Sequence, residues 1–132
     1  MNIIRQSMHF DASPDSLFDA YLSSRKHAAI VGSKVSISKA VGRRFAAFNG
    51  MLSGKNLLII PKTFVVQSWR SRRWKKTDAD SVLILMFSKT RRGAQIELVH
   101  VNVPEHDFLG VARGWHRYYW KPWLKYLKRS SN

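Results

Sequence analysis

The sequence predicts an α+β fold in which a curved antiparallel sheet of about six to seven strands wraps around a long C-terminal helix. Aromatic residues recur with helical spacing over residues 104–129, and short alternating segments separated by turn residues fill most of the chain before them. The order of the elements is the third observation. A strand meander followed by an amphipathic helix buries both apolar surfaces when the helix lies in the concave face of the sheet.

The C-terminal helix is expected over residues 104–129, with one aromatic and one basic face. Pro122 should remove a backbone hydrogen bond to Tyr118 and kink the helix. So many aromatic side chains need an apolar partner, and only the strands before them can supply it. At ~100° per residue, the aromatic face holds Phe108, Ala112, Trp115, Tyr119, Trp123 and Tyr126, and the opposite face holds Arg113, Arg117, Lys121, Lys125 and Lys128.

The first third of the chain predicts a strand over residues 3–10 and then two short helices. Ser13 is a good N-cap, and Pro14 suits the first helical position. The second helix should run over residues 25–30 and end before Gly32. The apolar stripe of the first helix is Leu17, Phe18, Tyr21 and Leu22.

From residue 35 onward the apolar period becomes two, which indicates strands. Asn49-Gly50 is the strongest hairpin signal in the chain. No repeat or linker interrupts the pattern, so we expect one domain over residues 1–132. The expected strands cover residues 35–41, 43–48, 51–60, 64–70, 82–87 and 94–103.

Composition indicates a folded protein of basic character. The 132 residues are 45% hydrophobic and include no cysteine, which excludes disulfides and thiolate chemistry. No apolar run approaches the ~20 residues of a membrane helix, and no signal-peptide core is visible, so we expect a cytoplasmic protein. The formal net charge of +15 favours polyanions as partners, although a solvated basic surface would carry the same charge.

Several short runs of the chain carry a family resemblance. In chain order they are residues 12–14, 53–57, 66–70, 80–81, 98–100 with 103–104, and 114–122. Together they resemble the Aha1 C-terminal-domain family, the activator of Hsp90 ATPase homologue-like proteins of the START/Bet v 1-like (SRPBCC) superfamily. The resemblance covers nearly the whole chain and implies a helix-grip fold with an elongated pocket between sheet and helix.

The sequence departs from the family pattern in two ways. Gly42-Arg43 stands where the family commonly has Gly-Gly. These residues also hold no counterpart of the N-terminal domain of the eukaryotic co-chaperone, so the resemblance does not carry co-chaperone activity over. Family membership therefore predicts the fold far better than the activity.

The predicted pocket residues alternate along strands toward the helix or lie on its aromatic face. They would line a cavity for a lipid-like or aromatic ligand, with His100 and a tyrosine hydroxyl as polar anchors. The alternative is that the aromatic side chains fill this space as core. The candidates are Phe45, Trp69, Leu83, Leu85, Phe87, Ile96, Leu98, His100, Trp115, Tyr119 and Trp123.

Basic side chains interleave with tryptophan over residues 69–76, a pattern that can grip phosphates and stack on bases. No nucleic-acid motif accompanies the run, so we expect only weak, nonspecific nucleic-acid binding. The run could instead bind an acidic protein partner, which is Hsp90-like by resemblance. The simplest interpretation is a solvated basic loop. The basic-face candidates are Arg70, Arg72, Arg73, Lys75, Lys76, Arg113, Arg117, Lys121 and Lys125.

The apolar run over residues 82–87 breaks the expected alternation. Val82, Ile84 and Met86 should face away from the core, which suggests a homodimer contact. Lysine and arginine stems from neighbouring strands could cover them instead, so monomer and homodimer both stay open.

Enzyme chemistry has little support in the sequence. The five histidines do not pair at a zinc-ligand spacing, and no nucleophile elbow, P-loop or dinucleotide loop occurs. We expect neither a metal nor a cofactor. His100 could act as a general base, but the interpretation that we favour is a hydrogen-bonded core histidine.

The function that these observations favour is noncatalytic binding of a small hydrophobic ligand between sheet and helix. The first alternative is a protein-interaction module that docks an acidic partner, of the Hsp90 type by resemblance, through its basic face. The second alternative is an enzyme acting on a pocket-bound substrate.

Overall fold

A computed structural model describes residues 2–130 of the protein. β1 (Ile3–Phe10) is followed by α1 (Pro14–Tyr21) and α2 (Ser24–Val31). The strands β2 (Arg44–Ala47), β3 (Leu52–Ile60), β4 (Phe64–Ser71), β5 (Ser81–Thr90) and β6 (Gly93–Val101) come next. The C-terminal helix consists of η1 (Glu105–Asp107), α3 (Phe108–Trp115), η2 (His116–Trp120) and α4 (Lys121–Ser130).

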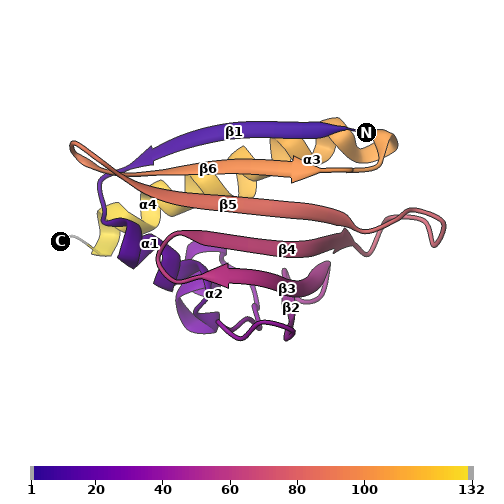
Figure 1. Cartoon of the computed structure of the whole chain (residues 1–132), viewed down its shortest axis with the longest axis horizontal. Coiled ribbons are helices and arrows are strands. Elements are labelled where there is room, and N and C mark those ends of the chain that lie inside the picture. The colour runs from indigo at the N-terminus through magenta and orange to yellow at the C-terminus, as the bar shows by residue number, and fades with distance from the viewer. Residues whose placement is uncertain (1, 131–132) are drawn as a thin grey trace.

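The six strands form one antiparallel sheet in the order β1-β6-β5-β4-β3-β2. The helices lie on one face of this sheet, and the C-terminal helix runs along the strands behind β6 (Figure 1). The core fills the space between that face and the helices. The predicted α+β architecture, with a curved sheet, a long C-terminal helix and two short helices after the first strand, is therefore confirmed.

Local sequence signals account for the helix ends and the tight hairpin. The Ser13 hydroxyl accepts a hydrogen bond from the Ser16 amide, and Pro14 occupies the first turn of α1, as predicted. Gly32 ends α2 with a φ of 71°, the left-handed conformation that glycine adopts without strain. In the β2–β3 turn, Asn49 and Gly50 also have positive φ, which explains the strength of that hairpin signal.

The strand predicted over residues 35–41 is wrong. Only a single bridge forms there, between Ser36 and Ala46. The Ser24 hydroxyl satisfies both the amide and the carbonyl of Ile37, and the Asn56 side chain bonds two further carbonyls beyond it. Because side chains have taken these backbone groups, the segment cannot join the sheet as an additional strand.

A π-helical turn, η2, interrupts the C-terminal helix just before Pro122. The turn adds a residue to one helical repeat, so Trp120 enters the core beside Trp115 and Tyr119. The Trp115 and Trp120 rings stack with centroids 5.7 Å apart. For this reason, a helical wheel at 100° per residue does not place Trp120 on the buried aromatic face.

The face of the sheet away from the helices carries a block of apolar side chains. Ile84 of β5 lies directly opposite Val99 of β6 and Val66 of β4, and Val66 lies opposite Leu58 of β3. The cross-strand neighbours of Ile84 are thus apolar residues. They are not the lysine and arginine side chains that were the alternative cover for this face in the sequence analysis. In the neighbouring row Met86 lies opposite Phe64, which lies opposite Ile60, and the row ends in the charged Glu97 of β6.

Candidate functional site

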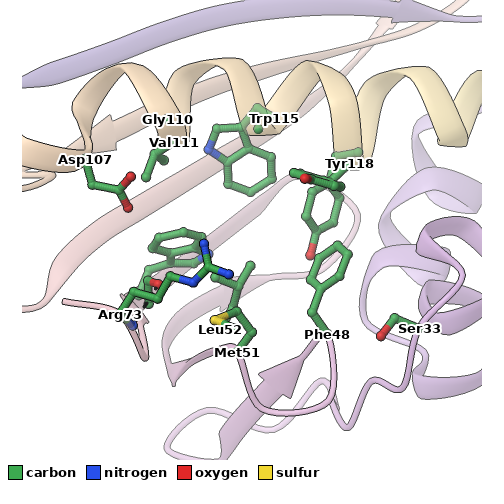
Figure 2. Close-up of a pocket in the computed structure, with 14 residues that line it drawn as sticks. Ser33, Phe48, Met51, Leu52, Arg73, Asp107, Gly110, Val111, Trp115 and Tyr118 are labelled. Carbon is green, nitrogen blue, oxygen red and sulfur yellow. Dashed lines mark hydrogen bonds between the residues drawn. The ribbon is translucent and has the colours of Figure 1, made fainter.

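A cleft of about 570 Å³ lies between the C-terminal helix and the β3–β4 end of the sheet. We call it the aromatic cleft. Trp115 and Tyr118 project into it from the helix, and Phe48 and Met51 approach from the β2–β3 hairpin (Figure 2). Its lining is Ser33, Phe48, Met51, Leu52, Trp69, Ser71, Arg73, Asp107, Gly110, Val111, Gly114, Trp115, Tyr118 and Tyr119.

Two glycines, one helical turn apart, keep the cleft open along the helix. Gly110 and Gly114 both line it, and neither contributes a side chain to fill it. A Cβ at Gly114 would meet only the Tyr118 ring, at an ordinary contact distance of 3.6 Å. A Cβ at Gly110 would lie 2.5 Å from a carboxylate oxygen of Asp107. Position 114 can therefore accept a side chain into the cleft without disturbing the backbone.

Aromatic rings form the deeper walls and support one another. The Trp115 ring lies 6.2 Å from that of Trp69 and 4.7 Å from that of Tyr119, measured between centroids. Phe48 meets Tyr118 and Tyr119 edge-on, at 5.8 and 5.9 Å. These contacts join the hairpin to the helix across the cleft. Edge-on aromatic pairs fix the orientation of the rings in addition to burying apolar surface.

Polar groups lie at the two ends of the cleft. Arg73 and Asp107 lie toward one end, and Ser33 lies toward the other (Figure 2). One carboxylate oxygen of Asp107 accepts a 2.8 Å hydrogen bond from the indole N–H of Trp74. An apolar middle with polar ends suits a molecule that is mostly hydrophobic and carries polar substituents at its extremities.

Tyr119 connects the cleft wall to a buried histidine. The Nδ1 of His27 lies 2.7 Å from the carbonyl of Tyr21, which can only accept, so Nδ1 carries the proton. The Tyr119 hydroxyl therefore donates to Nε2, at 2.9 Å. Burial lowers the pKa of His27 to about 4, despite the opposing effect of the carbonyl bond, and burial raises the pKa of Tyr119. Both groups are neutral at pH 7.

His100 and Ser81 form a buried pair whose geometry superficially resembles a catalytic dyad. The two side chains lie 2.8 Å apart, but the indole N–H of Trp115 donates to Nδ1 of His100, at 3.1 Å. The neutral imidazole must then carry its proton on Nε2 and donate it to Ser81, whose own hydroxyl donates to the carbonyl of Trp69. Burial lowers the pKa of His100 to about 3. In this tautomer His100 cannot take a proton from Ser81, so the geometry of the pair fits a structural role.

The predicted pocket residues fall into two groups. Trp69, Trp115 and Tyr119 line the aromatic cleft. The remaining candidates lie in the core, away from the cleft lining: Phe45, Leu83, Leu85, Phe87, Ile96, Leu98, His100 and Trp123.

Sequence reasoning missed the hairpin residues Phe48 and Met51 because both lie in the turn, where the alternation of strand side chains does not apply. The Gly110 and Gly114 pair was a readable signal, since two glycines four residues apart leave a gap on one side of a helix.

The predicted basic face divides between two surfaces. Arg73 lines the aromatic cleft, whereas Arg113, Arg117 and Lys121 line a separate groove on the other surface of the helix, beside β1. Arg70 is half-buried, and its guanidinium binds the carbonyls of Asp78 and Lys75 and the carboxylate of Asp80, so it holds the β4–β5 loop together. The other candidates, Arg72, Lys75, Lys76 and Lys125, are exposed.

The tryptophans of the basic run do not face solvent. Trp69 and Trp74 are 5% and 6% exposed, and their rings pack against each other with centroids 5.6 Å apart. Neither ring is available to stack on a base, which removes the structural basis for nucleic-acid recognition through this run.

Within residues 2–130 no three His, Asp or Glu side chains gather in a way that could hold a metal ion. The described helices also include none that is long and apolar enough to cross a membrane.

Known proteins resemble this chain in sequence. Residues 11–127 match the family described as activator of Hsp90 ATPase homolog 1-like protein. A Dictyostelium discoideum protein named activator of 90 kDa heat shock protein ATPase homolog is 26% identical over 108 residues. That alignment covers 82% of this chain but only 28% of the Dictyostelium protein, so the chain spans little more than a quarter of that relative.

Solved structures share the fold over nearly the full chain. Protein MLL2253 from Mesorhizobium loti superposes with a TM-score of 0.83 at 18% identity, covering 97% of this chain and 98% of that one. PFC0360w from Plasmodium falciparum, described as an HSP90 activator, gives 0.79 at 20% identity, with 90% of each chain covered. At these identities the likeness establishes the fold alone.

Proposed function

The chain belongs to the family of activator of Hsp90 ATPase homolog 1-like proteins, and from that premise we propose that it binds a small hydrophobic ligand in the aromatic cleft without transforming it. The observation that carries the proposal is the cleft itself. Its volume of about 570 Å³ falls within the range typical of small-molecule sites. Its walls are aromatic, and its polar groups gather at the two ends.

The absence of catalytic geometry at the cleft supports binding rather than catalysis. Asp107 is the one carboxylate among the lining residues, and the Trp74 indole already occupies one of its oxygens. The Tyr119 hydroxyl donates a hydrogen bond to His27, and His100 donates one to Ser81. Tyr119, His27 and His100 thus have their hydrogen bonds within the protein, which favours binding over acid–base chemistry at the cleft.

The cleft walls favour a flat, mostly apolar ligand with hydroxyl or carbonyl groups at its ends. Tyr118 and Phe48, which are less buried than the tryptophans, offer ring surface for stacking, and Arg73 offers a donor at the mouth. A flavonoid such as naringenin has this shape, and oleate is a comparison with a flexible chain.

Gly114→Leu tests the proposal by placing a side chain in the cleft at the position that tolerates one. Naringenin should quench the tryptophan fluorescence of the natural chain, and Gly114→Leu should weaken its binding by at least about tenfold. Lys125→Leu adds the same side chain on α4, at an exposed position that lines neither depression, and should bind normally. Salt should have little effect, because the cleft is mainly apolar.

Native mass spectrometry of freshly purified protein provides the independent check. A heavier native species that loses a small molecule on denaturation would support an occupied cleft and give the mass of the ligand. A bare native mass, together with equal naringenin affinity in Gly114→Leu and the natural chain, would refute the proposal.

A second candidate function is docking to an acidic protein partner, of the Hsp90 type. The names of the Dictyostelium and Plasmodium relatives favour it, as does the net charge of +15. The test is the ATPase rate of purified Hsp90 with and without this chain, at low and high salt. Stimulation that disappears when Arg72, Arg73, Lys75 and Lys76 are replaced by Ser supports the candidate. An unchanged ATPase rate over a wide range of chain concentration rejects it.

A further inference from the structure

A second depression, of about 660 Å³, lies between the edge strand β1 and the C-terminal helix. We call it the basic groove. It shares no lining residue with the aromatic cleft. Its lining is Met8, Arg113, His116, Arg117, Trp120, Lys121 and Leu124.

The groove has an apolar floor and a cationic rim. Trp120 is buried, and its indole N–H donates to the side-chain oxygen of Gln6 at 2.7 Å, so the floor offers no free polar group from that ring. Gln6 in turn donates to the carbonyl of Ala112 at 2.9 Å, which fixes β1 against the helix. Met8 and Leu124 are half-buried and complete an apolar strip along the groove.

Three exposed cations follow one another along the rim with helical spacing. Arg113, Arg117 and Lys121 lie four residues apart in the sequence, and all three side chains line the same groove. Among residues 2–130, no carboxylate lines the groove. Within residues 2–130, the salt bridges of the protein involve other cations, so these three have no acidic partner in the folded chain.

The backbone beside the groove is also unpartnered. β1 lies at the end of the strand order, and in the described chain it pairs only with β6. The carbonyl of Asn2 bonds the Asn102 amide, so even-numbered residues of β1 point their hydrogen-bonding groups at β6. The amides and carbonyls of Arg5, Ser7 and His9 then face the open edge, on either side of Met8.

From this juxtaposition we propose that the basic groove binds an extended acidic segment of a partner protein, which adds to the free edge of β1. Side chains on one face of an extended chain repeat every ~6.7 Å, so a short segment presents several of them to a row of cations. Acidic residues at alternate positions could therefore meet Arg113, Arg117 and Lys121 in succession, while apolar residues of the segment reach Met8 and Leu124. A single-headed anion such as a fatty acid would leave most of this row unused.

The proposal rests on the second candidate function only in taking the partner to be an acidic protein. It does not require that partner to be Hsp90. Peptide binding in the groove without any effect on the Hsp90 ATPase would reject the chaperone and leave the groove intact.

The probe is a fluorescein-labelled seven-residue peptide with glutamate at alternate positions and Val, Phe and Val between them. Replacing Arg113, Arg117 and Lys121 by Ser should weaken its binding by at least about tenfold. The matched control replaces Arg72, Lys75 and Lys76 by Ser, which removes the same charge from the exposed β4–β5 loop. That variant should bind within about threefold of the natural chain, because distant exposed charges are screened.

Two further readouts decide whether the segment is recognised as a strand. On binding, the amide protons of Arg5 and Ser7 should become protected from hydrogen exchange. A peptide of identical composition with its four glutamates consecutive should bind at least several-fold more weakly.

Equal weakening by the two triple variants would mean attraction to net charge alone and would overturn the proposal. Binding without protection of the β1 amides, or displacement of the peptide by laurate at lower concentration than by the unlabelled peptide, would also overturn it.

Discussion

His27 and His100 are the two histidines that the fold buries, and hydrogen bonds hold each in one neutral tautomer. The carbonyl of Tyr21 fixes the proton on Nδ1 of His27, whereas the indole of Trp115 leaves the proton of His100 on Nε2. His100 was a candidate pocket anchor on the sequence alone. In the structure both of its nitrogens are hydrogen-bonded to protein groups, Ser81 and Trp115.

Stability should therefore fall as the pH falls from 7 to 5. Burial lowers the pKa of His27 to about 4 and that of His100 to about 3, from an ordinary value of 6.5. The unfolded chain then binds more protons than the native state below pH 6.5, so protonation favours unfolding. Each histidine should cost on the order of 2 kcal/mol at pH 5. Urea unfolding at pH 7, 6 and 5 measures the effect.

The matched variants for this experiment are His27→Gln and His9→Gln. The first removes one of the two buried titrating groups and should roughly halve the pH dependence, whatever it does to the stability at pH 7. The second alters an exposed side chain and should keep the slope of the natural chain. A natural chain with the same urea midpoint at all three pH values would contradict the assignment of neutral buried histidines.

At the scale of elements, the segment between α2 and β2 shows how a side chain can replace a strand. Asn56 is buried, and its amide donates to the carbonyls of Ser38 and Ala40 at 2.8 and 3.0 Å. Its oxygen accepts from Gln67, which accepts in turn from the hydroxyl of Tyr21. The segment thus attaches to the sheet through this polar network and a few backbone hydrogen bonds, among them the Ser36–Ala46 bridge, rather than through a continuous ladder.

Asn56→Ala should loosen this segment first and the whole fold second. The substitution leaves the amide of the fully buried Gln67 without an acceptor, which should cost about 2 kcal/mol in unfolding free energy. Amide exchange over residues 36–43 should accelerate more than exchange in β5 and β6. Ser53→Ala on the same strand serves as the control, because Ser53 is half-buried and should change neither quantity. Uniform acceleration across the sheet would contradict a local role for Asn56.

In the C-terminal helix, too, a local sequence signal has a structural outcome that depends on tertiary contacts. Its aromatic and basic faces follow from a period of 3.6 residues, and Pro122 correctly indicates a local disturbance. The type of disturbance depends on the core, since the π turn becomes favourable only because Trp120 has Phe10, Trp115 and Trp123 to pack against.

At the scale of the whole molecule, the helices cover one face of the sheet and leave an apolar block on the other. The homodimer contact predicted at Val82, Ile84 and Met86 stays a prediction, and size-exclusion chromatography with light scattering tests it. Ile84→Lys places a charge between Val66 and Val99 and should convert a dimer into a monomer.

Ser88→Lys is the matched control for that experiment. It adds the same charge to β5 at an exposed position beyond the apolar rows, and should leave the association unchanged. A natural chain that is monomeric at high micromolar concentration would reject the contact.

Apart from the strand expected over residues 35–41 and the π-helical turn, the sequence by itself determined the order of the elements, the N-cap of α1, the hairpin turn and the family, because these depend on local chemistry and on periods of two and 3.6 residues. It also determined which side chains are apolar enough to be buried. Which of those side chains line a cleft was decided only by the tertiary structure. Phe48 and Met51 reach the helix through a hairpin turn, and the cleft exists where Gly110 and Gly114 face them. The division of the basic residues into two surfaces likewise depends on contacts between distant segments, which no local pattern encodes.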